Sequence, residues 1–250
     1  MSDPIHIISL GAGVQSSAMA IMACHGLIKP MPDCAMFADT GDETRETYLW
    51  IKELSRLVTF PVISLKGPRL SDMIVNEWGH SQIPAFYLNK KGEAAIGRRQ
   101  CTKYFKVIPI RRELRVRYPG RNIVLWQGIS LDELSRMKDS GRQWLEHRFP
   151  LIELRKTRGD CDAYLKTVTS WRVPKSACVY CPFKEPARWR ESTKRPEEMA
   201  TINRVEAVLT PRNEYLTPKL KPISHIDFSS EEDRGQVNMF NNECEGMCGV

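Results

Sequence analysis

Four cysteines stand in two closely spaced pairs, an arrangement suited to thiol chemistry or metal binding. Cys178 and Cys181 belong to the segment SACVYCPFK, and Cys244 and Cys248 belong to the C-terminal NNECEGMCGV. Two thiolates three positions apart can hold one metal ion or one edge of an iron–sulfur cluster. Each pair needs further ligands to complete such a site, so spacing alone leaves metal binding and thiol redox chemistry both open.

A second candidate site is the small-residue segment SLGAGVQSSA at residues 9–18. Gly11 and Gly13 allow a tight turn, and amides at the start of a following helix, with Ser16 and Ser17, offer donors to an anion. A dinucleotide-binding turn is one alternative, since Asp39 follows a second apolar run, but its third glycine is missing. A Walker-type phosphate loop is excluded because no Gly-Lys-Ser/Thr is present.

Charge is distributed unevenly along the chain. The formal net charge is +7, yet residues 223–250 hold six acids and one base. Residues 98–121 hold nine Arg or Lys residues and a single Glu. Such a basic region attracts polyanions, so nucleotide phosphates and a nucleic-acid backbone, DNA or tRNA, are both candidate partners.

Composition places the chain among globular proteins. Of its 250 residues, 42% are hydrophobic and 27% charged, close to ordinary averages, which argues against wholesale disorder. No apolar run approaches the roughly 18–20 residues that cross a bilayer, and the N-terminal MSDPIHIISL has no basic signal-peptide region. We therefore expect a soluble cytoplasmic protein with no membrane partner, and a homo-oligomer is compatible with the sequence.

The first half alternates short apolar runs with helical patterns, which predicts an α/β fold with a parallel sheet sandwiched by helices in three layers. Strands are predicted at 5–10, 34–39, 61–65 and 122–129, with a fifth at 149–154, and a loop at 79–97. Helices are predicted from 16, at 45–58, 70–78, 103–118, 160–168, 185–193 and 196–209. We divide the chain into a nucleotide-binding domain at 1–185 and a helical and irregular extension with an acidic, cysteine-containing tail at 186–250.

Four segments, in order, resemble the phosphoadenosine phosphosulfate (PAPS) reductase-like family of the ATP-pyrophosphatase, or PP-loop, superfamily. They are SLGAGVQSSA, ADTGDETRETYLWIKEL (38–54), CTKYFKVIPIRREL (101–114) and GISLDELSRM (128–137). The resemblance implies an adenine nucleotide alpha-hydrolase-like, Rossmann-like fold, with ATP or PAPS bound across the carboxyl edge of the sheet. Gly11–Ser16 stand where ATP-hydrolysing members carry Ser-Gly-Gly-Lys-Asp-Ser, so the loop Lys and Asp are absent.

The resemblance also implies roles for individual residues. The first turn would hold the phosphates, and the ends of the second and fourth predicted strands, with cations, would complete the site. The nucleotide-binding candidates are Ser9, Gly11, Ala12, Gly13, Gln15, Ser16, Ser17, Asp39, Thr40, Gly41, Lys106, Arg111, Arg112, Gly128, Asp132 and Glu133. Asp39 and Arg136 are also catalytic candidates.

The resembling family has an iron–sulfur subset, and this bears on the cysteines. Its members bind a [4Fe–4S] cluster through a Cys pair in the third segment and a later Cys-x-x-Cys. This chain has Thr102 at the second position of that pair, so Cys161 is our substitute ligand. We expect a [4Fe–4S] cluster, with zinc as the alternative, on Cys101, Cys161, Cys178 and Cys181.

The tail resembles the Glu-Cys-Gly tail of sulfonucleotide reductases, although Glu245 intervenes before Gly246. This implies that Cys244 is the nucleophile, with a thioredoxin-like protein as reductant. The first hypothesis is therefore a PAPS reductase-like oxidoreductase or sulfurtransferase. The alternatives are an ATP-dependent enzyme that sulfur-modifies nucleic acid, as in DNA phosphorothioation or tRNA thiolation, and a non-catalytic binding module.

Overall fold

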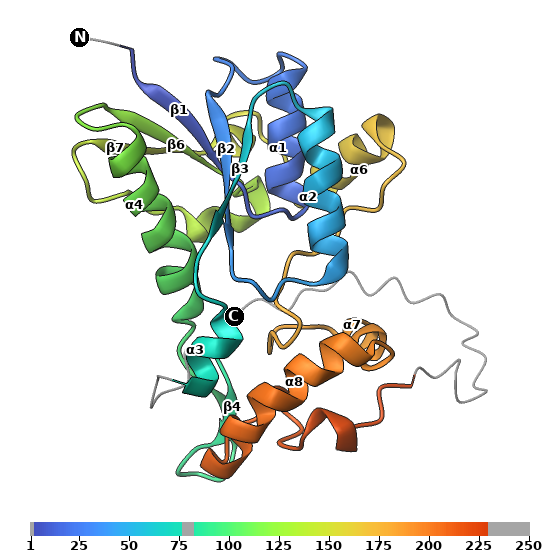
Figure 1. Cartoon of the computed structure of the whole chain (residues 1–250). Helices are drawn as coiled ribbons and strands as arrows, with labels where there is room; N and C mark the ends of the chain where they lie inside the picture. Colours follow the sequence, from blue (N-terminus) through green and yellow to red (C-terminus); the bar gives the residue numbers. More distant parts are fainter. Residues whose placement is uncertain (1–2, 77–82, 230–250) are drawn as a thin grey trace.

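The computed structural model describes residues 3–76 and 83–229. Its central sheet has five parallel strands in the order β3-β2-β1-β6-β7 (Figure 1). The strands are β1 (Ile5–Ser9), β2 (Cys34–Asp39), β3 (Val62–Lys66), β6 (Ile123–Gln127) and β7 (Leu145–Arg148). The predicted α/β fold with a parallel sheet is confirmed.

Helices cover both faces of this sheet. One face packs against α1 (Val14–Cys24), α2 (Arg45–Leu57) and α6 (Arg158–Val168), and the other packs against α4 (Ile108–Arg117). Neighbouring residues of a strand lie on opposite faces of the sheet. Ile8 packs in the apolar cluster with α1, α2 and α6, and Ile7 packs in the cluster with α4. Because both faces are buried, the central strands read as continuous apolar runs rather than alternating ones.

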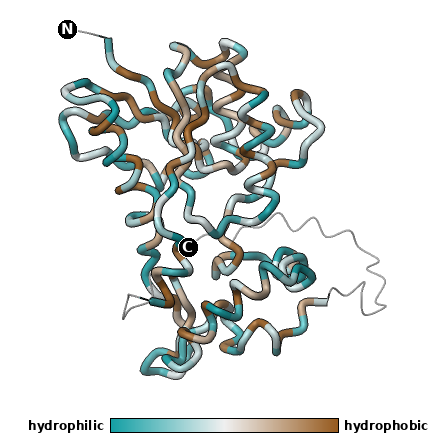
Figure 2. Tube along the Cα trace, in the orientation of Figure 1, coloured by the Kyte–Doolittle hydropathy of each residue, from teal (hydrophilic) through white to brown (hydrophobic). Residues whose placement is uncertain are grey.

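A second lobe lies beyond the carboxyl edge of the sheet. It contains α3 (Leu70–Asn76), α7 (Pro186–Thr193) and α8 (Pro196–Leu209), and the antiparallel hairpin of β4 (Phe86–Leu88) and β5 (Ala94–Ile96). Its apolar cluster includes Trp189, Ile202 and Leu216, which are fully buried. Figure 2 shows hydrophobic positions along the chain in both lobes. The lobe thus combines segments from both sides of residue 185.

Three further elements connect the sheet to its surroundings. A π-helix at Thr102–Val107 leads directly into α4, a 3₁₀ helix at Leu131–Arg136 follows β6, and a short helix α5 (Pro150–Glu153) follows β7. Two more 3₁₀ turns follow α8, at Thr210–Arg212 and Ile223–His225. Within the described ranges, no helix is long and apolar enough to cross a bilayer.

Two predicted elements are wrong. The strand expected at 149–154 is instead the helix α5, because Pro150 at its first position favours a helix start and cannot donate to a sheet ladder. The strand lies just before it, as β7.

The loop expected at 79–97 contains the β4–β5 hairpin, whose turn is closed when Lys91 and Glu93 donate backbone N–H groups to the Asn89 side chain. Strands of three residues are too short to show alternation in the sequence.

Candidate functional site

The turn between β1 and α1 presents backbone rather than charge at the sheet edge. Ala12 adopts a left-handed conformation with φ of 56°, and Gly13 is the N-cap residue of α1. The first turn of α1 contains no acidic residue, and its cap makes no side-chain hydrogen bond. The first backbone N–H groups of a helix have no intrahelical acceptor, so those of this turn can donate to a bound anion.

The end of β6 is packed directly against this turn. A Cβ atom on Gly128 would lie 2.9 Å from both the Cα and the backbone N of Ser16, so any larger residue would displace the start of α1. Ser17 lies deeper, where its hydroxyl accepts a hydrogen bond of 2.8 Å from Trp50 Nε1. The fold therefore places Gly128 beside the start of α1.

Gln15 connects the turn to the segment after β6. Its amide nitrogen donates to Ser130 Oγ at 3.4 Å and to Glu133 at 3.2 Å, and its amide oxygen accepts from Arg158 at 2.8 Å. The predicted residue Asp132 accepts the Arg158 backbone N–H at 3.0 Å. Arg158 is therefore a cation beside the turn that sequence reasoning missed.

Asp39 ends β2 and is fixed by two donors. Its Oδ1 accepts from the Tyr48 hydroxyl and from the Gly41 backbone N–H, each at 2.8 Å. Burial and the Asp39 carboxylate raise the pKa of Tyr48, so this phenol stays protonated as the donor. Gly41, at φ of 76°, packs against Arg69, where a Cβ would lie 2.7 Å from Arg69 Cγ.

An apolar cavity of about 230 Å³ opens beside Asp39. It lies where β2 and β3 end, against the π-helix and the start of α4. Its lining residues are Asp39, Leu65, Lys66, Gly67, Pro68, Met73, Tyr104, Phe105 and Pro109. A mostly apolar cavity with one carboxylate and one ammonium suits a flat heterocycle that carries polar edges.

Asp42 is a buried carboxylate with a complete set of donors. It accepts from the Arg69 guanidinium at 2.8 Å, from the Tyr180 hydroxyl at 2.8 Å, and from the backbone N–H of Ser71 at 2.7 Å. Burial raises the pKa of Tyr180, and the charges of Cys178 and Asp42 act in the same direction. These bonds join the end of β2 to α3 and to the second lobe.

Glu43 is also buried, and its carboxylate is the centre of a cluster of polar side chains. Its carboxylate accepts from Lys106 Nζ at 3.0 Å, Ser176 Oγ at 3.1 Å and Thr40 Oγ1 at 3.4 Å. Burial lowers the pKa of Lys106, but Glu43 and Cys178 outweigh it, so this pKa is raised and the ammonium form is maintained. Lys106, predicted as a nucleotide cation, is instead bonded to this carboxylate.

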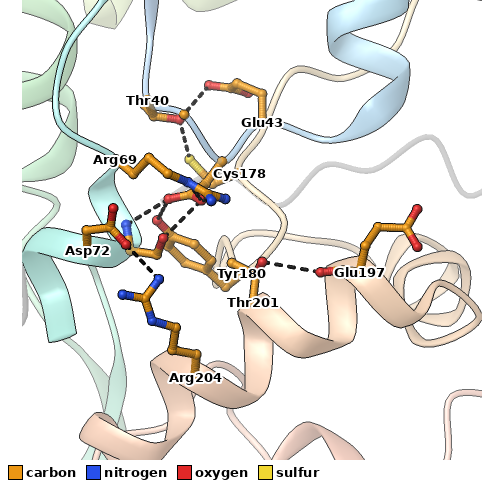
Figure 3. Close-up of polar contacts among 12 residues, drawn as sticks. Thr40, Glu43, Arg69, Asp72, Cys178, Tyr180, Glu197, Thr201 and Arg204 are labelled. Carbon is orange, nitrogen blue, oxygen red and sulfur yellow. Dashed lines mark hydrogen bonds and ion pairs between the residues drawn. The ribbon is translucent and has the colours of Figure 1, made fainter.

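Cys178 belongs to the same cluster. Its Sγ lies 3.2 Å from Thr40 Oγ1, and the backbone around it pairs with Glu43 in an isolated antiparallel bridge (Figure 3). Burial, followed by the Glu43 charge, raises the pKa of Cys178 well above its usual range, although Lys106 opposes this. Contact between Thr40 and Cys178 spans 138 positions, so no local sequence signal predicts it.

The structure separates Cys161 from the other three predicted cysteine ligands. Cys101 and Cys178 border the apolar cluster of the second lobe, and Cys181 shares the turn with Cys178, whereas Cys161 is fully buried in the sheet core. Among residues 3–76 and 83–229, no group of three or more His, Cys, Asp or Glu side chains is placed to hold a metal ion. These residues do not fit a four-cysteine cluster. Cys244 and Cys248 lie outside the described residues.

The remaining predicted residues have other contacts or are exposed. Arg111 donates to the Ser140 carbonyl at 3.2 Å, Arg112 is exposed on α4, and Arg136 pairs with Glu133 at 2.6 Å. Ser9 ends β1 in register with Gln127 of β6.

A wider cavity of about 510 Å³ lies on the other side of residues 41–43. It is bordered by α2 and the first turn of α8, including Arg45, Lys52 and Glu197. The loop after β2 thus has a cavity on each side, and the smaller, more apolar one is closer to Asp39.

Comparison with known proteins gives one kind of match. No protein-family model matches the chain, and no curated protein matches it. Among solved structures, the chain is similar to phosphoadenylyl-sulfate (PAPS) reductase from Candida auris in a phosphate complex, with 15% sequence identity and a TM-score of 0.44. The alignment covers 66% of this chain and 73% of that one. Because this overlap is partial, the function has to follow from the residues of this chain.

Proposed function

We propose that the chain is an enzyme that binds an adenine nucleotide across the carboxyl edge of its sheet and performs sulfur chemistry on it. The observation that carries the proposal is the pairing of two features on one edge. An amide-rich turn without acidic residues follows β1, and an apolar cavity of about 230 Å³ opens beside Asp39 after β2. An anion-binding turn next to a slot for a flat base is what a nucleotide requires.

The base would enter the smaller cavity. Tyr104 and Phe105 offer aromatic surface, and Asp39 is held in place by Tyr48 and Gly41 to accept hydrogen bonds from a ribose or from an exocyclic amine. Because Asp39 is already satisfied by two donors, it is oriented before the ligand arrives.

The phosphate groups would lie at the turn of residues 11–16. Backbone amides there replace the missing loop lysine, and Arg158 supplies positive charge through its contact with Gln15. Gly128 is required because it lets the end of β6 approach Ser16. The turn is therefore suited to binding phosphate without the Lys and Asp of the ATP-hydrolysing loop.

For a sulfonucleotide substrate, the proposed reaction is a thiol attack on sulfur. The Cys244 thiolate displaces adenosine 3′,5′-bisphosphate from PAPS, the S–O bond of the phosphosulfate breaks, and a Cys–S–SO₃⁻ intermediate forms. A dithiol protein of the thioredoxin class then attacks the Cys244 sulfur, releases sulfite and ends as a mixed disulfide, which its second thiol resolves. No step uses an iron–sulfur cluster.

Two assays on the same protein separate this proposal from its alternatives. Sulfite release from PAPS in the presence of reduced thioredoxin, absent in Cys244→Ser, supports the reductase reaction. Pyrophosphate release from ATP that depends on DNA or tRNA would support the nucleic-acid-modifying alternative instead. Nucleotides that bind and are recovered unchanged in both assays would indicate a binding module, and a chain that binds neither nucleotide would refute the proposal itself.

A further inference from the structure

A group of unpaired cations lies on the π-helix, on the irregular segment before it and on α4. Of the basic residues at 98–121, Lys106 and Arg117 pair with Glu43 and Glu113, and Arg111 and Arg121 donate to the carbonyls of Ser140 and Asp3. The others are all exposed, and we call them the basic face: Arg98, Arg99, Lys103, Arg112 and Arg115. Among the described residues, their side chains have neither an ion pair nor a hydrogen bond.

Three of these cations lie over aromatic rings. The Arg99 guanidinium lies 5.3 Å from the centre of the Phe183 ring, Lys103 Nζ lies 5.3 Å from that of Tyr104, and the Arg115 guanidinium lies 4.5 Å from Trp144. Phe183 is 48% exposed and Tyr104 is 37% exposed, so both rings also face solvent. Three of the five cations thus each contact an aromatic ring.

The basic face borders the candidate site. Tyr104 also lines the cavity beside Asp39, and the charge of Arg99 acts on Lys106, which is bonded to Glu43. From there α4 continues along the sheet face opposite α1 and α2 (Figure 1). A polyanion lying along this face would therefore pass the opening of the cavity.

We propose that the basic face docks a single strand of nucleic acid. Phosphodiester groups carry a repeated negative charge that five unpaired cations complement, and exposed rings stack on bases that a duplex keeps buried. A free nucleotide is too short to use cations that extend to Arg115. This inference goes beyond nucleotide binding and does not depend on which reaction the site performs.

The test is fluorescence anisotropy with a labelled 20-nucleotide single strand, DNA in one arm and RNA in another, titrated at several salt concentrations. Five phosphate contacts predict a slope of about −3.5 in log K against log [salt], so affinity falls about 100-fold between 50 and 200 mM salt. The variant R98Q/R99Q/K103Q/R115Q leaves one of the five cations, so the slope should flatten to about −0.7.

A charge-matched control removes four exposed cations elsewhere, in the variant R56Q/K166Q/R172Q/K194Q. It should bind the strand within about threefold of the original chain. Equal loss in both variants would show a general charge effect and overturn the docking surface. Both variants should bind the adenine nucleotide as the original chain does, which separates failure of this inference from failure of the proposed function.

Two further arms identify the occupant. Phe183→Leu should weaken single-strand binding by about fivefold, because one stacked base is lost. A duplex bound as tightly as the single strand, with no effect of Phe183→Leu, would overturn the single-strand assignment. Vesicles with anionic lipid that bind more tightly than the strand would favour a membrane surface, and no binding to any of these probes would refute the proposal.

Discussion

The sheet core and the second lobe bury different kinds of side chain. The sheet core buries aliphatic and aromatic residues with neutral polar groups such as Gln15, Ser16 and Ser17. The buried charged residues in the described ranges all lie at the junction or in the second lobe: Asp42, Glu43, Lys184, Glu198 and Glu206. The sheet is therefore held by apolar burial, whereas the second lobe is attached to it through ionic and hydrogen-bonded contacts.

This difference has a consequence for the site. The side-chain hydrogen bonds between the loop after β2 and the Cys178 segment each involve a carboxylate or a group bonded to one. A buried charge destabilises the fold unless it is fully paired. Substitutions in this loop should therefore destabilise both lobes. The turn after β1, which we propose binds phosphate, by contrast packs on the sheet core and bonds through Gln15 to the segment after β6 and to Arg158.

The largest effect on stability is expected for Glu43→Gln. It leaves Lys106 facing an amide and Ser176 and Thr40 with a weaker acceptor, and breaking a buried ion pair costs about 3 kcal/mol. Urea unfolding at pH 7 measures this loss. Ser17→Ala, the matched change in the sheet core, removes a neutral acceptor from Trp50 and should cost about 1 kcal/mol. Equal costs would contradict the contrast between the two regions.

A comparable effect, limited to a pH window, is expected at Glu206. Burial raises its pKa from 4.5 to about 7, although the backbone N–H of Ile223 opposes this. Because the folded state keeps a proton that the unfolded state releases, stability falls as pH rises from about 4.5 to 7. The free energy of unfolding of Glu206→Gln, relative to the original chain, should therefore increase by about 3 kcal/mol across that window. A pH-independent difference would refute this account of the lobe.

The smallest effect is expected for Cys161→Ser on metal content. Cys161 is fully buried in the sheet core, and the other three predicted ligands adjoin the second lobe. Iron, sulfide and zinc analysis of protein purified without oxygen should therefore give the same values for Cys161→Ser as for the original chain. Loss of metal in this variant would show that the thiols come together and restore the four-cysteine prediction.

The sequence predicted the sheet and its edge better than the second lobe. Continuous apolar runs and a Gly-rich turn are local signals, and they located β1, β2, β6 and the turn of residues 11–17 correctly. The roles of Arg158, Tyr48 and Ser176 were missed because each acts through a contact formed only in the fold. Cys161 was chosen as a ligand from its place in the chain, but its buried face belongs to α6 in the sheet core.

The most direct test of nucleotide binding at this edge is calorimetric titration of Gly128→Ala with ATP and with PAPS. An added Cβ would meet the backbone of Ser16 at 2.9 Å and displace the turn, so affinity should fall at least about tenfold, or about 1.4 kcal/mol. Gly159→Ala, where the new Cβ would make only an ordinary contact at 3.7 Å, is the control and should bind normally. Affinity in Gly128→Ala equal to that of the control, in a variant that is still folded, would contradict a phosphate site at this turn.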